Sequence, residues 1–263
     1  MRLLFFLNVT ERDKSQAVEE LIKDSTPSKD FFIMTILSVL MATLGLLIDS
    51  ASVVIGSMLI APILSPVLSM AMGLVMSDSK ILSRSFFTVL KAVAYGIAAA
   101  AIATMFFSNQ SEFSNEIMSR TEPSLIYAVI AVLAGFAASL SLIKPQLSDK
   151  IPGIAISVAL IPPLAVTGIG LARFSWTIIS GSLMLFLVNI IGILFASMIT
   201  FSLMNLYVKR NIALNTIKKE EEQIMKEQVK IEKEKEKIVE EELKEKERII
   251  KKVTRKPKKK KKK

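Results

Sequence analysis

The segment IGSMLIAPILSP occupies residues 55–66 and places two prolines inside an apolar run long enough to cross a membrane. A second apolar run, residues 156–164, reads ISVALIPPL. A shift of 100 residues superposes the two, aligning Asp49 with Asp149, Ser57 with Ser157, Pro62 with Pro162 and Leu64 with Leu164. Each proline removes an amide donor and disturbs the carbonyl one turn earlier, and lipid cannot satisfy the freed groups. Both runs therefore predict broken helices whose open backbone groups face neighbouring helices, a water-filled cavity or a solute.

Similar apolar runs flank these two segments, each long enough to cross about 30 Å of hydrocarbon. The chain is 51% hydrophobic with a mean hydropathy of +0.48, which is typical of membrane proteins. We predict an all-α polytopic membrane protein with six spans, at residues 31–48, 51–76, 86–107, 124–143, 151–172 and 177–207. The last is too long for one crossing, so we expect its end to continue as helix into the cytoplasm.

The six spans form two halves, residues 31–107 and 124–207, and the second helix of each half is the proline-broken one. Because three is an odd number of crossings, the second half enters the membrane from the opposite face, and the repeat is inverted. Inverted repeats with broken helices in matching positions indicate a transport site near the bilayer midplane. The simpler interpretation is that the prolines only kink helices for close packing.

The net charge of +10 comes entirely from the C-terminal segment. Residues 208–263 hold 22 Lys and Arg against 12 Asp and Glu, so residues 1–207 are balanced at 12 of each. Basic residues favour the cytoplasmic side. We therefore place both termini in the cytoplasm with the loops carrying Lys80, Arg84, Lys144 and Lys150, and place Asp49, Arg120 and Arg173 outside.

Three segments lie outside the predicted membrane domain. Residues 1–30 predict a strand at 3–7, too short for a signal peptide, and then a helix with apolar positions at Ala17, Val18, Leu21 and Ile22. Residues 208–250 predict a charged cytoplasmic helix, and residues 251–263 a disordered polybasic tail that binds anionic lipid. The tail lacks aromatics that would stack bases, which disfavours specific nucleic-acid recognition. One apolar position per heptad, at Ile217, Ile224, Ile231 and Ile238, favours only a weak coiled coil within a homo-oligomer.

Two motifs stand out in this chain: residues 55–66, and residues 153–164 followed by Gly168. They resemble the prokaryotic membrane protein family catalogued as domain of unknown function 389. The resemblance covers roughly residues 31–207, and the order of the two motifs is specific. The family commonly has Ala where this chain has Ser57, and its members often carry a larger amino-terminal domain. The resemblance implies a multi-pass protein of a prokaryotic plasma membrane, but it supplies no substrate and no functional residues.

Eleven residues near the breaks and deep in the spans are candidates for a solute or ion pathway: Asp49, Ser57, Pro62, Ser65, Pro66, Asp149, Ser157, Pro162, Pro163, Thr167 and Asn189. Each has a plainer interpretation. The two aspartates could cap helices, the hydroxyls could bond back to their own helix, and the amide could form a helix contact.

The sequence contains no Cys and no His, and it places no charged residue in the centre of a predicted span. We therefore expect no enzyme, no metal site, no cofactor, and no proton coupling through a buried carboxylate. Carbonyl oxygens at the breaks could still bind an ion. The leading hypothesis is a transporter or channel for a small solute or ion. The alternative is an oligomeric membrane scaffold whose basic cytoplasmic tail recruits partners or anionic lipid.

Overall fold

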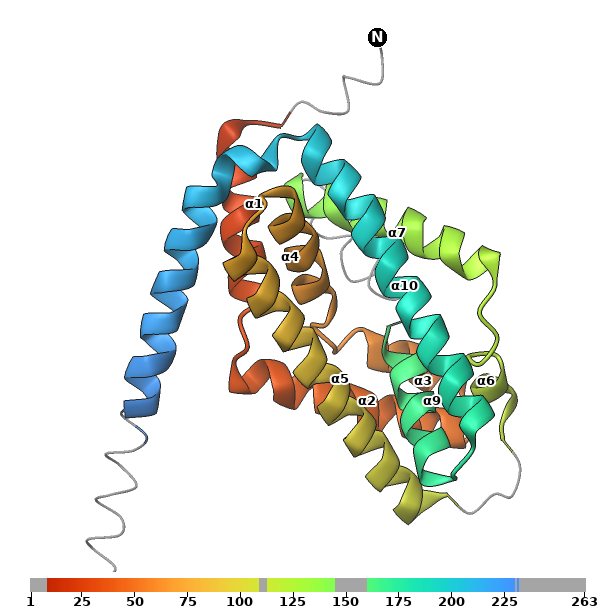
Figure 1. Cartoon of the computed structure of the whole chain (residues 1–263). Helices are drawn as coiled ribbons and strands as arrows, with labels where there is room; N and C mark the ends of the chain where they lie inside the picture. Colours follow the sequence, from red (N-terminus) through yellow and green to blue (C-terminus); the bar gives the residue numbers. More distant parts are fainter. Residues whose placement is uncertain (1–8, 109–112, 145–159, 230, 232–263) are drawn as a thin grey trace, which may run out of the picture. The chain divides into compact units, whose positions relative to one another are not determined.

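The computed structural model describes residues 9–108, 113–144, 160–229 and 231, and within them every regular element is a helix. This confirms the predicted all-α class. The chain divides into two compact units, Met1–Ile217 and Lys218–Lys263. In the second unit, residues 218–229 are helical. The remaining description concerns the first unit (Figure 1).

Four helices are long and apolar enough to cross a membrane: α2 (Lys29–Leu47), α5 (Ser79–Phe107), α7 (Leu125–Ile143) and α10 (Trp176–Leu203). They correspond to the predicted first, third, fourth and sixth spans. Many of their large apolar side chains remain exposed, including Phe106 at 80% and Leu125 at 86%. Apolar surface on this scale indicates contact with lipid, so the protein is a membrane protein.

The predicted second span is two separate helices, α3 (Ala51–Met58) and α4 (Leu64–Val75), with Pro62 in the break between them. The predicted fifth span is described only in its second half, as α9 (Ile161–Ala172), because residues 151–159 lie outside the described residues. The break predicted at Pro62 is therefore confirmed.

Two smaller helices close the ends of the unit. The amphipathic helix predicted near the amino terminus is α1 (Glu11–Asp24), which begins with a reciprocal capping box between Thr10 and Asp13. Its predicted apolar positions are all buried: Ala17, Val18, Leu21 and Ile22. The strand predicted at residues 3–7 lies outside the described residues. The second small helix is α6 (Asn115–Met118), in the loop after α5.

The predicted helical continuation of the last span through residue 207 is wrong. Helix α10 ends at Leu203, and Asn205 adopts a left-handed conformation with φ of 55°. Asparagine tolerates this conformation because its short polar side chain can bond locally. A 3-10 turn, η3 (Leu206–Lys209), follows, and residues 210–229 are again helical.

Two pairs of helices start at a common spacing along the chain, and this spacing differs from the shift of 100 residues that aligns the two proline segments. Helices α4 and α9 start at residues 64 and 161, and α5 and α10 start at 79 and 176, so both pairs are 97 residues apart rather than 100. Each half-helix ends in the same turn, with a left-handed residue at Ser77 (φ 49°) and Phe174 (φ 53°). At this spacing Pro66 corresponds to Pro163, the third residue of α4 and of α9, whereas the sequence alignment pairs Pro62 with Pro162.

The two ends of the unit are fixed by polar contacts between distant segments. At the α1 end, Arg84 Nη2 donates to Thr26 Oγ1 at 2.9 Å, and Lys209 pairs with Glu11 at 2.9 Å. At the α6 end, Ser114 Oγ donates to the carbonyl of Leu46 at 2.6 Å. Figure 1 shows α4 and α9 at opposite ends of α5. The contacts of their glycines give the same arrangement, because a Cβ added to Gly73 of α4 would meet Leu82, near the start of α5, and a Cβ added to Gly168 of α9 would meet Ala100, toward its end.

Candidate functional site

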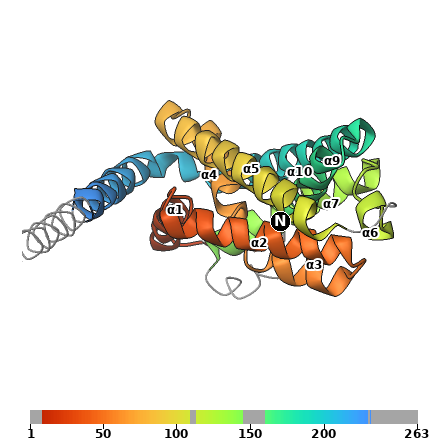
Figure 2. The ribbon, with the colours of Figure 1, turned by 90° about the horizontal axis from the view of Figure 1, so that it is seen from below.

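The break between α3 and α4 lies level with the middle of α2. Ser38 is the tenth of the 19 residues of α2, and its hydroxyl donates a 2.6 Å hydrogen bond to the carbonyl of Ser57 in the last turn of α3. Figure 2 shows α3 lying beside α2. The Ser57 hydroxyl donates in turn to the carbonyl of Val54 at 2.6 Å, as the back-bonding interpretation predicts. Because both serines are fully buried, carbonyls at the helix end are satisfied within the protein rather than by lipid.

A cavity of about 200 Å³ opens at this break. Its walls come from the break and α4, from α7 and from α1, and the lining residues are Leu21, Asp24, Leu59, Ala61, Pro62, Leu64, Ser65, Leu68, Ala138 and Leu142. The cavity thus reaches from the middle of the unit toward the α1 end. Most of the lining is apolar, and Ser65 and Asp24 supply its side-chain oxygens.

Asp24 brings a titratable group to a site where the sequence predicted none. It is the last residue of α1, a helix expected to be only a cytoplasmic cap. Desolvation by its neighbours raises the pKa of the Asp24 carboxyl, and the charge of Glu20 acts in the same direction, although the side chain still reaches solvent. The carboxyl therefore stands at the mouth of the cavity and outside its apolar interior.

The prolines of α9 lie in its first turn. Pro162 and Pro163 are the second and third residues of α9, where a missing N–H removes no intrahelical hydrogen bond. From Ile161 to Gly170 every residue of this half-helix is buried. Helix α9 is therefore enclosed on all sides and packs against α2, α5, α10 and α3.

Thr167 and Asn189 lie along the contact between α9 and α10. Thr167 Oγ1 is 2.8 Å from both the carbonyl of Pro163 and Ser182 Oγ. The two helices run antiparallel, so residues before Thr167 on α9 lie level with residues after Ser182 on α10, and the start of α9 is level with Asn189. Asn189 is buried and is the fourteenth of the 28 residues of α10. The α3–α4 break is thus level with the middle of α2, and the start of α9 is level with the middle of α10.

The structure separates the predicted pathway residues into three sets. Ser57, Pro62, Ser65 and Pro66 gather at the α3–α4 break, and Pro162, Pro163, Thr167 and Asn189 lie on α9 and α10. Asp49 is remote from both: it lies at the α6 end, where its carboxylate accepts from the backbone N–H of Glu116 at 2.9 Å. Asp49 does not cap the broken span as that interpretation supposed: α3 has Ser50 at its N-cap, and the Asp49 carboxylate instead accepts from the first turn of α6, whose N-cap is Ser114. Asp149 and Ser157 lie outside the described residues.

Sequence reasoning missed the environment of Asp78. Its buried carboxylate accepts from the backbone N–H groups of Lys80 at 3.0 Å and Ile81 at 3.1 Å, and from Arg210 Nε at 2.7 Å. Burial raises the pKa of Asp78, but the Arg210 and backbone hydrogen bonds outweigh it, so that the pKa lies below its ordinary value. An aspartate just before a long apolar run was the available signal for the cap, but no local pattern indicates the distant arginine.

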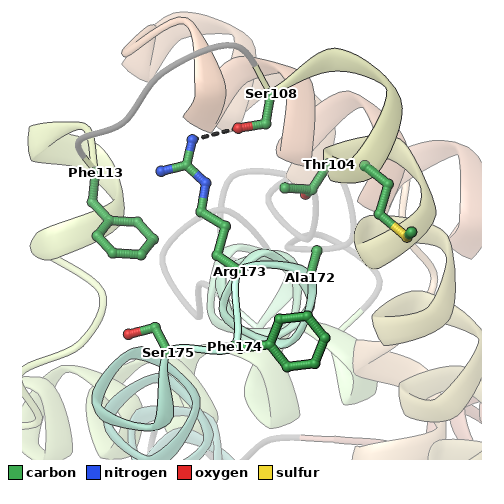
Figure 3. A pocket seen from close by; sticks show the side chains of 8 residues that line it. Thr104, Ser108, Phe113, Ala172, Arg173, Phe174 and Ser175 are labelled. Atoms are coloured by element: carbon green, nitrogen blue, oxygen red, sulfur yellow. Dashed lines mark hydrogen bonds between the residues drawn. The ribbon is translucent and has the colours of Figure 1, made fainter.

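A second, larger pocket of about 640 Å³ lies at the α6 end (Figure 3). It is lined by Thr104, Met105, Ser108, Phe113, Ala172, Arg173, Phe174 and Ser175. The Arg173 guanidinium donates to Ser108 Oγ, and its central carbon lies 4.9 Å from the centre of the Phe113 ring. The sequence placed Arg173 in an outer turn but gave no sign of this pocket.

Residues 58–195 match the family described as "Domain of unknown function (DUF389)". The chain belongs to this family. It is also similar to the uncharacterized protein MJ0678 of Methanocaldococcus jannaschii, with 29% identity over 203 residues. The similar region covers 74% of this chain and 63% of that protein, so the chain spans less than two thirds of its relative. No solved structure matches the chain.

Proposed function

We propose that this protein is a transporter or channel for a small solute or ion, with a pathway at the interface of two inverted repeats. The observation that carries the proposal is the cavity at the α3–α4 break, which lies at half depth within a unit of membrane-length helices. Irregular backbone at this depth is tolerated only where it is buried in protein or lines a water-filled cavity. Broken helices of this kind form the substrate sites of many transporters.

The packing of the helices supports the inverted repeat. At the offset of 97 residues, α4 corresponds to α9 and α5 corresponds to α10. The contacts are reciprocal, since α5 packs against α9 and α10 packs against α4. Helix α2 packs against α5 as α7 packs against α10. Two halves that exchange equivalent contacts in this way are expected of a pseudo-two-fold arrangement.

One pair of contacts breaks this symmetry, and it suggests how the pathway opens. Helix α2 packs directly against α9, whereas the cavity lies between α4 and α7, the equivalent pair in the other half. The unit is therefore open toward the α1 end. In an alternating-access cycle, closing α4 on α7 while separating α2 from α9 would open the opposite end.

The distribution of basic residues supports a cytoplasmic α1 end in a plasma membrane. This end carries Lys14, Lys23, Lys80, Arg84, Lys209 and Arg210, whereas Arg120 and Arg173 lie at the α6 end. Basic residues are retained on the cytoplasmic side during insertion. Both termini would then be cytoplasmic, and the cavity at the break would open inward.

Flux measurements in liposomes test the proposal. The purified protein would be assayed with a broad panel of ions and small solutes, and wild type would be compared with a Pro62→Ala, Pro66→Ala double variant. Removing both prolines allows α3 and α4 to join, which should close the break and reduce flux. Pro123→Ala, in the loop before α7, is the matched control. The absence of flux across the panel would overturn the proposal.

A scaffold is the second candidate, because the residues that begin the predicted cytoplasmic tail pack in the core of the first unit, Met1–Ile217. Ala213 and Ile217 are buried in its core, so Ile217 is not available for the predicted coiled-coil seam. In this alternative the homo-oligomer presents the charged tail to partners, and residues 251–263 bind anionic lipid. Deleting residues 218–263 separates the two candidates, because a transporter keeps its flux whereas a scaffold loses its cellular function. Without His or Cys in the sequence, we propose no catalytic role.

A further inference from the structure

The pocket at the α6 end combines the requirements of an anion site. Of its eight lining residues, all within the described part of the chain, Arg173 alone is charged, and Thr104, Ser108 and Ser175 add hydroxyls. Its volume of about 640 Å³ lies within the usual range for small-ligand sites. Arginine suits such a site because its planar fork of N–H groups matches the oxygens of a carboxylate or phosphate.

The guanidinium is held in place rather than left free to swing. Figure 3 shows the Arg173 side chain extending between Ser108 and Phe113, with the Ser108 hydroxyl accepting a hydrogen bond and the Phe113 ring beside the charged group. These two contacts come from the end of α5 and from the loop that follows it. A positioned guanidinium loses less side-chain entropy when it binds a ligand.

The charge of Arg173 outweighs the partial charges of the helix ends around the pocket. Helices α5 and α9 end at the pocket, and each C-terminus carries roughly half a negative charge. Helix α10 begins there with roughly half a positive charge, and its N-cap Ser175 makes no side-chain capping bond. Together with the full charge of Arg173, these groups leave roughly half a positive charge in excess, which favours an anionic ligand.

The geometry points to a binding site for a small oxyanion, a carboxylate or phosphate group, held by Arg173 with hydroxyls of the pocket wall. The oxyanion belongs either to a free solute or to a lipid headgroup, since apolar Met105 and Phe174 are exposed at the same pocket. The site does not depend on transport: it binds the anion whether or not the solute crosses the membrane.

Tryptophan fluorescence gives a direct test, because the chain has one tryptophan, Trp176, three residues after Arg173. Full-length protein in neutral detergent would be titrated with sodium phosphate and, separately, sodium benzoate, at constant ionic strength set with sodium chloride. The same protein in nanodiscs of phosphatidylcholine, with and without phosphatidylglycerol, tests the headgroup. The variants are Arg173→Gln and Arg173→Lys. The control is Arg120→Gln, which also removes one positive charge, but from an arginine that lies outside the pocket and pairs with Glu116.

We expect a saturable fluorescence change in wild type and Arg120→Gln, with affinity lowered roughly tenfold or more in Arg173→Gln and less in Arg173→Lys. A change with a soluble anion in detergent identifies a free ligand, and one only with phosphatidylglycerol identifies a headgroup. The proposed site would be overturned if no arm gave a saturable change, or if a folded Arg173→Gln protein bound with the same affinity as wild type. Arg173 would then be only a cation at a helix end. Liposome flux is measured separately, so absent flux with intact binding contradicts transport alone.

Discussion

The hydroxyl of Ser38 reaches from the middle of α2 to the main-chain carbonyl of Ser57, 19 residues later, at a distance of 2.6 Å. The contact holds the end of α3 level with the middle of α2, where α3 stops and the chain turns into α4. A side chain from a neighbouring helix thus satisfies a backbone group near the break, which stabilises the break in a membrane environment.

Replacing Ser38 with alanine should therefore weaken the break. Interhelical hydrogen bonds in membrane proteins contribute about 1 kcal/mol, so we expect the free energy of unfolding in detergent to fall by about that amount. Thr43→Ala is the matched control, because within the described part of the chain the Thr43 hydroxyl donates to the carbonyl of Val39 in its own helix and to no other helix. Equal stability of Ser38→Ala and Thr43→Ala in a thermal or denaturant melt would contradict this role for Ser38.

Close packing of α9 against α5 depends on Gly168. A Cβ added there would lie 2.4 Å from the Cβ of Ala100 and 2.7 Å from the carbonyl oxygen of Ile97. We expect Gly168→Ala to destabilise the protein by about 1–3 kcal/mol, because backbone must move to relieve the clash. Gly56→Ala is the control, since its Cβ would meet only the flexible end of Met41 at 3.2 Å. If the two variants melt together, the enclosed position of α9 is wrong.

The ion pair between Asp78 and Arg210 should make stability depend on acid pH. The pKa of Asp78 lies below its ordinary value of 3.8, so the ionised carboxylate stabilises the fold above that pH. This stabilisation is lost as the pH falls through the lowered pKa. At neutral pH, Asp78→Asn should lower the free energy of unfolding by about 2 kcal/mol, and the difference from wild type should shrink on acidification. Melts of both proteins between neutral pH and pH values below the Asp78 pKa check this.

The exposed Glu19 offers the control for that series, because Glu19→Gln removes a carboxylate from the open face of α1. Its stability should follow wild type across the pH range. A constant difference between Asp78→Asn and wild type at every pH would show that the charge of Asp78 does not contribute.

The sequence predicted the elements that depend on local pattern. Apolar runs located α2, α5, α7 and α10, and spacing located the buried face of α1. Aligning Pro62 with Pro162 gives a shift of 100 residues, whereas α4 and α9 start 97 residues apart, because prolines are tolerated at several positions around a helix start.

Contacts between distant segments were beyond local patterns. Nothing near Ser38 indicates that it bonds Ser57, and nothing near Asp24 indicates a place at the cavity mouth. The same applies to the assembly of the Arg173 pocket from α5, α9 and the start of α10. These sites arise only when helices pack, and a single sequence records no such pairing.

The most direct test of a pathway at the break uses one introduced cysteine, because the chain contains none. Ser65 is half-buried at the cavity, whereas Ser69, one turn further along α4, is fully buried and bonded to Ser85 at 2.8 Å. Ser65→Cys and Ser69→Cys proteins in liposomes would be treated with a charged, membrane-impermeant thiol reagent, and labelling and flux would be measured together. We predict that Ser65→Cys is labelled and loses flux while Ser69→Cys is unlabelled and keeps it. A folded Ser65→Cys protein that resists the reagent, or that is labelled with flux unchanged, would contradict a pathway through the break.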